Sequence, residues 1–249
     1  MITILIDGKT CEARADQSLW EAAWENGIKI PALCRHEALP GRSCCRLCIV
    51  ETENVDGKRS VVVSCEYPVK ENIKVYTKSE KIVRLRRVLL ALLIERAPQA
   101  EGALPAYCFE YGVSGYAGLF NVCPNQKCIL CGKCSRACEK LGNSAIRMTR
   151  CGVDKVVAPP FDEPPPDCIG CAACAKVCPT GAIECLNEKE QRIIWGKKFA
   201  LVKCAACRKL YATVEELEWL KAKLPHMEPN LLAYCPQCRR RRVANGVMA

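Results

Sequence analysis

The 249-residue chain is poor in the side chains that most enzyme active sites use. It contains only 2 histidines, and it has no nucleophile–base pair, no glycine-rich dinucleotide loop and no ligand set for a nickel–iron or molybdenum centre. Its longest apolar run, residues 88–94, is far too short to span a bilayer. The N-terminus lacks the cationic segment of a signal peptide. We therefore expect a cytoplasmic protein without a membrane anchor or a catalytic site of its own, in a compartment that keeps thiols reduced.

Cysteine is the residue that the chain has in excess, with 22 copies. Two runs have the spacing C-x2-C-x2-C-x3-C and begin forty positions apart. This spacing predicts a domain with two [4Fe–4S] clusters, because a loop with a cysteine at every third position offers three thiolates to one cubane. A disulfide framework fits poorly, since the chain is not a tiny secreted domain. The runs are Cys128, Cys131, Cys134 and Cys138, then Cys168, Cys171, Cys174 and Cys178.

The fourth cysteine of each run is expected to ligate the other cluster. Such crossed ligation would hold the two clusters close enough for electron transfer. An Ala-Ile pair follows each run, at Ala145 and at Ala182, and is predicted to form the short strand that closes each half. The predicted ligands are Cys128, Cys131, Cys134 and Cys178 for the first cubane, and Cys168, Cys171, Cys174 and Cys138 for the second.

Residues 1–78 have the pattern of a small half-open barrel. Strand-like alternation in residues 3–6 and 9–13 surrounds an Asp-Gly turn and predicts a hairpin. Ser18 and Glu21 form the capping box of a following helix. A long loop then carries several cysteines and a later strand carries one more, as in a plant-type [2Fe–2S] domain. These cysteines are Cys34, Cys44, Cys45, Cys48 and Cys65.

The segments around these cysteines resemble a known group of iron–sulfur subunits. A Pro-x-Leu-Cys approach ends at Cys34, and residues 45–51 read Cys-Arg-Leu-Cys-Ile-Val-Glu. Both are similar to the N-terminal domain of the large iron–sulfur subunit of respiratory complex I, to the small diaphorase subunit of soluble NAD-reducing hydrogenases and to the N-terminal part of iron-only hydrogenases. The resemblance extends over residues 1–187 and includes the Pro-Phe-Asp-Glu-Pro segment at 160–164. It implies a β-grasp fold with a [2Fe–2S] cluster on Cys34, Cys45, Cys48 and Cys65, and it leaves Cys44 as an extra residue.

Residues 79–124 are predicted to connect two ferredoxin-like domains. Residues 79–97 have the pattern of one amphipathic helix, with a solvated face rich in arginine. The resembled family has a further His-x3-Cys-x2-Cys-x5-Cys site after this helix, but residues 98–127 contain no histidine and only two cysteines. We therefore predict no third cubane and an irregular connection over residues 102–118. Cys108 and Cys123 are predicted to be buried thiols. The arginines that flank the helix are Arg84, Arg86, Arg87 and Arg96.

Residues 188–249 carry two C-x2-C pairs separated by 27 residues, with a predicted helix at 214–224 between them. Two such pairs are typical of a structural tetrahedral zinc. A further iron–sulfur cluster is the alternative, and His226 is expected to be a surface residue. The predicted ligands are Cys204, Cys207, Cys235 and Cys238. The cysteines outside any ligand pattern are Cys11, Cys44, Cys108, Cys123, Cys151 and Cys185, the last of which is predicted to pack beside a cluster.

The formal charge of +10 is largely balanced if these sites are filled. An oxidised cluster or a zinc ion with four thiolates carries about −2, so four sites would leave the holoprotein at about +2. The basic run at residues 239–242 is then a solvated surface, or a contact for an acidic partner. Nucleic-acid binding is the least favoured interpretation, and it would require a salt-sensitive affinity.

Together these patterns predict an α+β chain that transfers electrons. The four parts are a β-grasp [2Fe–2S] domain at 1–78, a linker helix and connection at 79–124, a two-[4Fe–4S] domain at 125–187 and a zinc-ribbon-like lobe with four cysteine ligands at 188–249. The resemblance implies an electron-transfer subunit of a soluble oxidoreductase, which relays electrons between a flavin subunit that binds NAD(P)(H) and a hydrogenase. The same role in a formate dehydrogenase is the next alternative, and ferredoxin is a further candidate partner.

Other functions fit the residues less well. An iron-only hydrogenase needs a large extra domain with its own cysteines. The iron–sulfur subunit of succinate dehydrogenase has a shorter [2Fe–2S] loop than the ten residues between Cys34 and Cys45 demand. A free-standing multi-cluster carrier is a further alternative. A protein that is monomeric and stable on its own would distinguish this carrier from a subunit of a complex.

Overall fold

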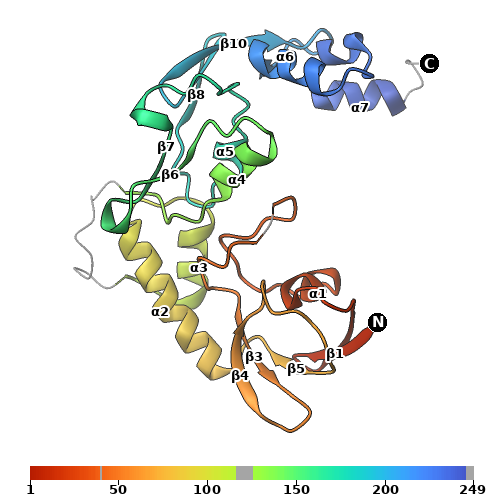
Figure 1. Cartoon of the computed structure of the whole chain (residues 1–249), viewed down its shortest axis with the longest axis vertical. Helices are drawn as coiled ribbons and strands as arrows, with labels where there is room; N and C mark the ends of the chain where they lie inside the picture. The colour runs from red at the N-terminus through yellow and green to blue at the C-terminus, as the bar shows by residue number, and fades with distance from the viewer. Residues whose placement is uncertain (40, 116–125, 245–249) are drawn as a thin grey trace.

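The computed structural model describes residues 1–39, 41–115 and 126–244 as a mixture of helices and sheets. Figure 1 shows an elongated chain with the N-terminal domain at one end and the C-terminal lobe at the other. The segment with the two cysteine runs lies between them (Figure 1). The mixed α+β class is confirmed.

The N-terminal domain is one five-stranded sheet with a helix against it. The strand order is β2-β1-β5-β3-β4, with β1 and β5 parallel and the other neighbours antiparallel. The predicted hairpin is confirmed as β1 and β2, and the Ser18–Glu21 capping box starts the helix as expected. The elements are β1 (Ile2–Ile6), β2 (Lys9–Ala13), α1 (Leu19–Glu25), β3 (Ile49–Glu53), β4 (Arg59–Val63) and β5 (Lys74–Tyr76).

Two packed helices lead out of this domain, α2 (Glu80–Arg96) and α3 (Ala103–Tyr111). Helix α2 agrees with the prediction, but α3 lies where we expected an irregular connection. Gly112 closes α3 in a left-handed conformation with φ +63°, and Pro105 lies in its first turn, where proline is tolerated. Cys108 is buried on α3 as predicted. Cys123 lies outside the described residues.

Arg86 contradicts the expectation that the α2 arginines lie on a solvated face, because it is 1% exposed. Its guanidinium donates hydrogen bonds to the carbonyl oxygens of Leu47 at 3.0 Å, Thr77 at 2.8 Å and Ile49 at 2.7 Å. A buried charge is tolerated when all its donors have partners. Arg86 therefore ties α2 to the start of β3, directly after the cysteine loop.

The segment with the two cysteine runs contains short elements around the loops. These are α4 (Lys133–Lys140), β6 (Arg147–Thr149), η1 (Gly152–Asp154), β7 (Val156–Ala158), η2 (Pro160–Asp162) and α5 (Ala173–Lys176). The Ala-Ile pairs do not form the predicted strands. Strand β6 starts only after Ile146, and the next strand starts at Cys185, after the second pair.

The C-terminal part is a four-stranded antiparallel sheet followed by helices. Its order is β11-β10-β9-β8, and it starts at Cys185, before the boundary expected at 187. The elements are β8 (Cys185–Glu188), β9 (Gln191–Ile194), β10 (Lys197–Lys203), β11 (Leu210–Thr213), α6 (Val214–Lys223), η3 (Pro229–Ala233) and α7 (Pro236–Ala244). Within the described residues, no helix is long and apolar enough to cross a membrane.

Candidate metal centres

The structure gathers the two cysteine runs around two cavities. One cavity of about 190 Å³ is lined by three cysteines of the first run together with the last cysteine of the second run. A narrower cavity is lined by three cysteines of the second run and the last of the first. The cysteines that line the first are Cys128, Cys131, Cys134 and Cys178, and those that line the second are Cys138, Cys168, Cys171 and Cys174. Each cavity is thus lined by the first three cysteines of one run and the last cysteine of the other, which is the arrangement that crossed ligation requires.

The backbone of both runs directs N–H groups at sulfur. Ala145 N donates to Cys138 Sγ at 3.2 Å, and Ala182 N donates to Cys178 Sγ at 3.3 Å. Each Ala-Ile pair therefore serves the last cysteine of its run, which is a role that the sequence pattern alone did not suggest. N–H donors to sulfur stabilise thiolate ligands of iron–sulfur clusters.

The thiols in these cavities require a cation to be held as thiolates. Burial raises the pKa of Cys131 to about 11, that of Cys134 to about 12 and that of Cys174 to about 12. The nearby Trp195 indole lowers the Cys174 pKa in part. Bound iron supplies the positive charge that makes such buried sulfurs stable as anions. The donor set and its surroundings fit two [4Fe–4S] clusters.

The cysteines of the N-terminal domain form a third group of sulfurs. Cys34, Cys45, Cys48 and Cys65 are all buried. The pKa of Cys34 lies well below its usual range, because the thiols of Cys44 and Cys45 lie within hydrogen-bonding reach of its sulfur. The pKa of Cys65 falls to about 7, mainly because the Cys48 thiol donates to it. The sulfurs thus form two close pairs, Cys34 with Cys45 and Cys48 with Cys65, and a set of four such thiols fits a [2Fe–2S] cluster.

Cys44 differs from its neighbour Cys45, because it is exposed and turns toward the first cubane loop. Its Sγ donates to the Cys131 carbonyl oxygen at 3.3 Å. The buried Arg136 side chain reaches the same place, since its Nη2 donates to Cys34 O at 2.9 Å and to Cys131 O at 3.3 Å. Two side chains therefore bridge the N-terminal cysteine loop and the first cubane loop.

The C-terminal sheet holds the backbone of the second cubane loop. Lys197 Nζ donates to Cys168 O at 3.0 Å, and Arg192 Nη1 donates to Gly170 O at 2.7 Å. The Thr213 hydroxyl donates to the carbonyl of the residue between them, Ile169. Three consecutive carbonyl groups of the loop thus have side-chain partners from the sheet. A β-carbon at Gly170 would lie 2.7 Å from the Phe199 ring, so the contact leaves no room for a side chain.

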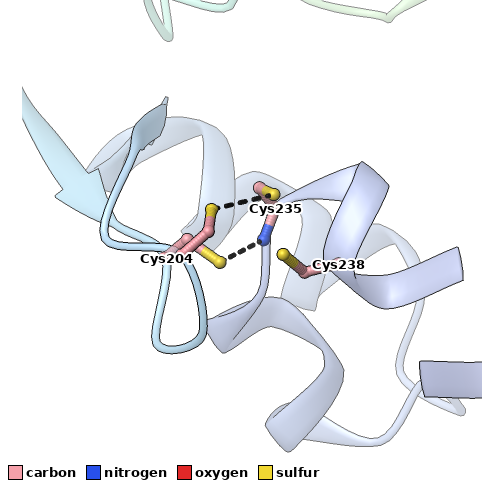
Figure 2. A group of neighbouring side chains, drawn as sticks. Cys204, Cys235 and Cys238 are labelled. Carbon is pink, nitrogen blue, oxygen red and sulfur yellow. Dashed lines mark hydrogen bonds between the residues drawn. The ribbon is translucent and has the colours of Figure 1, made fainter. Parts of the chain in front are cut away.

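The C-terminal cysteines form a fourth group. The Sγ atoms of Cys204, Cys207, Cys235 and Cys238 all lie within 4.8 Å of one another. Figure 2 shows the sulfur of Cys204, in the turn after β10, converging with those of Cys235 and Cys238, at the start of α7. Cys207 Sγ is 3.8 Å from Cys235 Sγ. The Cys235 N–H donates to Cys204 Sγ at 3.3 Å (Figure 2). Four thiols at this separation suit one tetrahedral ion.

The Cys204 thiol is prepared for a metal by its surroundings. Burial raises the pKa of Cys204, but the backbone N–H groups of Cys207, Cys235 and Ala206 outweigh this effect and lower the pKa to about 6. Peptide N–H groups that point at a cysteine sulfur stabilise the thiolate, which is the form that binds metal. His226 is exposed, as predicted.

Of the remaining cysteines, Cys11 is buried in the N-terminal core and Cys151 is exposed. Cys185 is half-buried and packs against buried apolar residues that include Cys134 and Cys174, and its place beside an iron–sulfur cluster stays a prediction. Sequence reasoning missed Arg136, which occupies an unspecified position inside the first run, and Trp195, which lies outside every motif. Only their placement in the fold brings them to the cysteine loops.

Comparison with known proteins agrees with this geometry. Residues 1–80 match the family model of a 2Fe-2S iron–sulfur cluster binding domain, and residues 127–182 match that of a 4Fe-4S dicluster domain. The NADP-reducing hydrogenase subunit HndD of Solidesulfovibrio fructosivorans is 32% identical over 224 residues, which cover 78% of this chain and 37% of that protein. The NADPH-Fe(3+) oxidoreductase subunit alpha of Geobacter sulfurreducens is 31% identical over 206 residues, covering 74% of this chain and 24% of that protein.

A chain in the crystal structure of an NAD+-reducing [NiFe]-hydrogenase in the H2-reduced state has a similar fold. Its TM-score is 0.62 at 26% identity, and the match covers 73% of this chain and 86% of that chain. The curated relatives are much longer, since this chain spans only 37% and 24% of their lengths.

Fold and matches together define an iron–sulfur protein with a [2Fe–2S] ferredoxin-type domain followed by a dicluster domain. The chain is homologous to iron–sulfur subunits of NAD(P)-linked, hydrogenase-type oxidoreductases and of complex I, which confirms the resemblance stated from its motifs.

Proposed function

We propose that this chain is the electron relay of a multi-subunit oxidoreductase, located in the cytoplasm. It would carry electrons between a flavin subunit that binds NAD(P)(H) and a hydrogenase subunit. The observation that carries the proposal is the spatial succession of three cysteine groups. Cys44 and Arg136 connect the cysteine loop of the N-terminal domain to the first cubane loop, and the two cysteine-lined cavities follow.

The proposed ligand sets follow the contacts of the described residues. Cys34, Cys45, Cys48 and Cys65 would hold a [2Fe–2S] cluster. Cys128, Cys131, Cys134 and Cys178 would hold the first cubane, and Cys168, Cys171, Cys174 and Cys138 the second. When bound, such clusters accept and release single electrons.

The protein's own groups position the sulfurs and set the charge around them. Ala145 N–H and Ala182 N–H donate to the sulfurs of Cys138 and Cys178. Arg136 brings a positive charge between the N-terminal loop and the first cubane loop, where it favours a more negative, reduced state on either side. These contacts support a path with short steps between neighbouring centres.

We further propose a structural zinc on Cys204, Cys207, Cys235 and Cys238. Zinc suits this group because its four sulfurs already converge, and because it would fix the far end of the sheet that holds the second cubane loop. A fourth iron–sulfur cluster is the alternative for this group.

A metal count on anaerobically purified holoprotein tests the ligand proposal. Ten irons and one zinc per chain are the expected values, made up of two irons for the [2Fe–2S] cluster and four for each cubane. Fourteen irons without zinc would replace the zinc by a further cluster.

The partners are tested separately by anaerobic pull-down of the tagged protein from its host, followed by mass spectrometry. A flavin- and nucleotide-binding subunit together with a hydrogenase subunit is the expected result, while a formate dehydrogenase subunit would identify the alternative terminal enzyme. A stable, lone monomer would contradict the relay and favour a free-standing carrier.

A further inference from the structure

Trp195 lies between the two cubane cavities, since its side chain lines both of them. It comes from the turn between β9 and β10, outside the segment that matches the dicluster family. Trp195 also packs against the apolar cluster that contains Cys134 and Cys174, which belong to different cavities. The chain therefore inserts an indole from its C-terminal sheet at the junction of the two proposed clusters.

The backbone at Trp195 accepts an unfavourable conformation to do so. Trp195 and Gly196 form a two-residue hairpin turn with φ values of +53° and +73°. A turn with two positive φ angles favours Asn-Gly or Asp-Gly, because a bulky side chain is disfavoured in the left-handed region. A bulky side chain in such a position points to a function for the indole rather than for the turn.

The hairpin that carries the indole is fixed to the second cubane loop on both sides. Lys197, directly after the turn, donates to the carbonyl oxygens of Pro166 at 2.9 Å and Cys168 at 3.0 Å. Arg192 on β9 donates to Gly170 O at 2.7 Å. These bonds hold the turn in register with the loop, so the indole has a defined position.

The indole N–H is the unsatisfied group at this junction. Trp195 Nε1 is buried and completes no hydrogen bond of regular geometry with any described residue, although it lies close enough to the Cys174 thiol to lower the pKa of that thiol. A buried donor without an acceptor is unfavourable, and tryptophan N–H groups usually have a partner when buried. Cys174, whose pKa the indole lowers, is one of the cysteines that line the second cavity. A sulfur of a bound cluster would supply the missing acceptor.

We propose that the Trp195 indole donates an N–H···S hydrogen bond to the second cubane, at Cys174 Sγ or at the sulfide beside it, and thereby raises the reduction potential of that cluster. The reason is that a hydrogen bond to sulfur stabilises the added electron of the reduced form. The inference rests on the proposed occupancy of the second cavity by a [4Fe–4S] cluster.

The test compares Trp195→Phe with Trp24→Phe in the holoprotein. Phenylalanine keeps an aromatic ring at position 195 but has no N–H. Trp24 is a matched control, because it is 52% exposed and stacks on Trp20 in the N-terminal domain. Iron is counted first, and the potentials of the two cubanes are then measured by EPR-monitored redox titration. Cys171→Ser, which changes a ligand of the second cubane, assigns its signal.

With ten irons retained, Trp195→Phe should shift the second cubane to a lower potential and leave the first cubane and the [2Fe–2S] centre unchanged, and Trp24→Phe should shift none of them. Unchanged potentials, or an equal shift of both cubanes, would overturn the assignment. An iron count below ten in the unmodified protein would instead refute the proposed clusters, so the two failures are distinguishable.

A second measurement needs no substitution and covers the case in which Trp195→Phe loses its iron. Unmodified protein labelled with indole-¹⁵N tryptophan is reduced and examined by pulsed EPR. A ¹⁵N coupling on the second cubane is expected, because the other tryptophans line neither cavity. Absence of any ¹⁵N coupling on either cubane would overturn the proposal.

Discussion

Replacement of Gly170 by alanine tests the contact between the C-terminal sheet and the second cubane loop. The new Cβ would lie 2.7 Å from Phe199 Cγ and 2.9 Å from Thr213 Cγ2, at a backbone φ of +67°. Both neighbours are buried, so neither can move aside freely. Alanine at a positive φ costs about 1–2 kcal/mol, and overpacking adds about 1–3 kcal/mol. Gly170→Ala should therefore lower the free energy of unfolding by about 2–5 kcal/mol.

Gly152→Ala is the matched control, because this glycine lies in the same domain, has φ +56° and has no atom within 4 Å of the added Cβ. Gly152→Ala therefore has only the cost of placing alanine at a positive φ, without the cost of overpacking. Gly170→Ala should thus melt lower than Gly152→Ala by roughly 2–12 °C, since 1 kcal/mol corresponds to about 2–4 °C for a chain of this size.

The assay is thermal unfolding of the anaerobic holoproteins by circular dichroism, with iron counted before and after mild heating. Gly170→Ala should also release up to about four irons earlier than the control, because its loop would carry one cubane. Equal melting temperatures and equal iron retention in the two variants would refute the view that the sheet supports this loop.

Three further substitutions test other parts of the structure. Arg86→Met should lower the free energy of unfolding by about 2–4 kcal/mol, because it leaves buried carbonyl groups without donors. Chemical denaturation measures this change, and the exposed control Arg84→Met should show a much smaller one. Equal effects of the two substitutions would contradict the role of Arg86. Cys45→Ser should abolish or alter the [2Fe–2S] EPR signal while Cys44→Ser preserves it, and the reverse pattern would exchange the two cysteines as ligands. Cys204→Ser should remove the zinc and leave ten irons on elemental analysis, whereas loss of iron with zinc retained would contradict the proposed zinc site.

The two iron–sulfur domains could be predicted from the sequence, because ligand spacing is a local property. The cysteine spacing in the runs that begin at Cys128 and Cys168 predicts the geometry of the ligand loops. The Ser18–Glu21 capping box and the first hairpin likewise depend only on neighbouring residues. Helix α3 carries local signals of its own in Pro105, in its first turn, and in Gly112, at its C-terminal end, which the prediction of an irregular connection did not use.

The contacts between segments could not be predicted from the sequence. Arg86 looks like any arginine on an amphipathic helix, and only the fold provides the three carbonyl groups that accept its hydrogen bonds. Arg136 lies on α4 but bonds to Cys34, 102 residues away in the chain. Trp195 occupies a turn whose dihedral angles do not favour tryptophan, so propensity gives no hint of its place between the cavities.

Rapid-freeze EPR of the native complex tests the central claim most directly. The purified complex is mixed anaerobically with NAD(P)H in one experiment and with hydrogen in another, and the [2Fe–2S] and [4Fe–4S] signals of this chain are followed in time. If the chain is the relay, its clusters should become reduced from either side within one turnover. Clusters that stay oxidised while the complex turns over would contradict the relay.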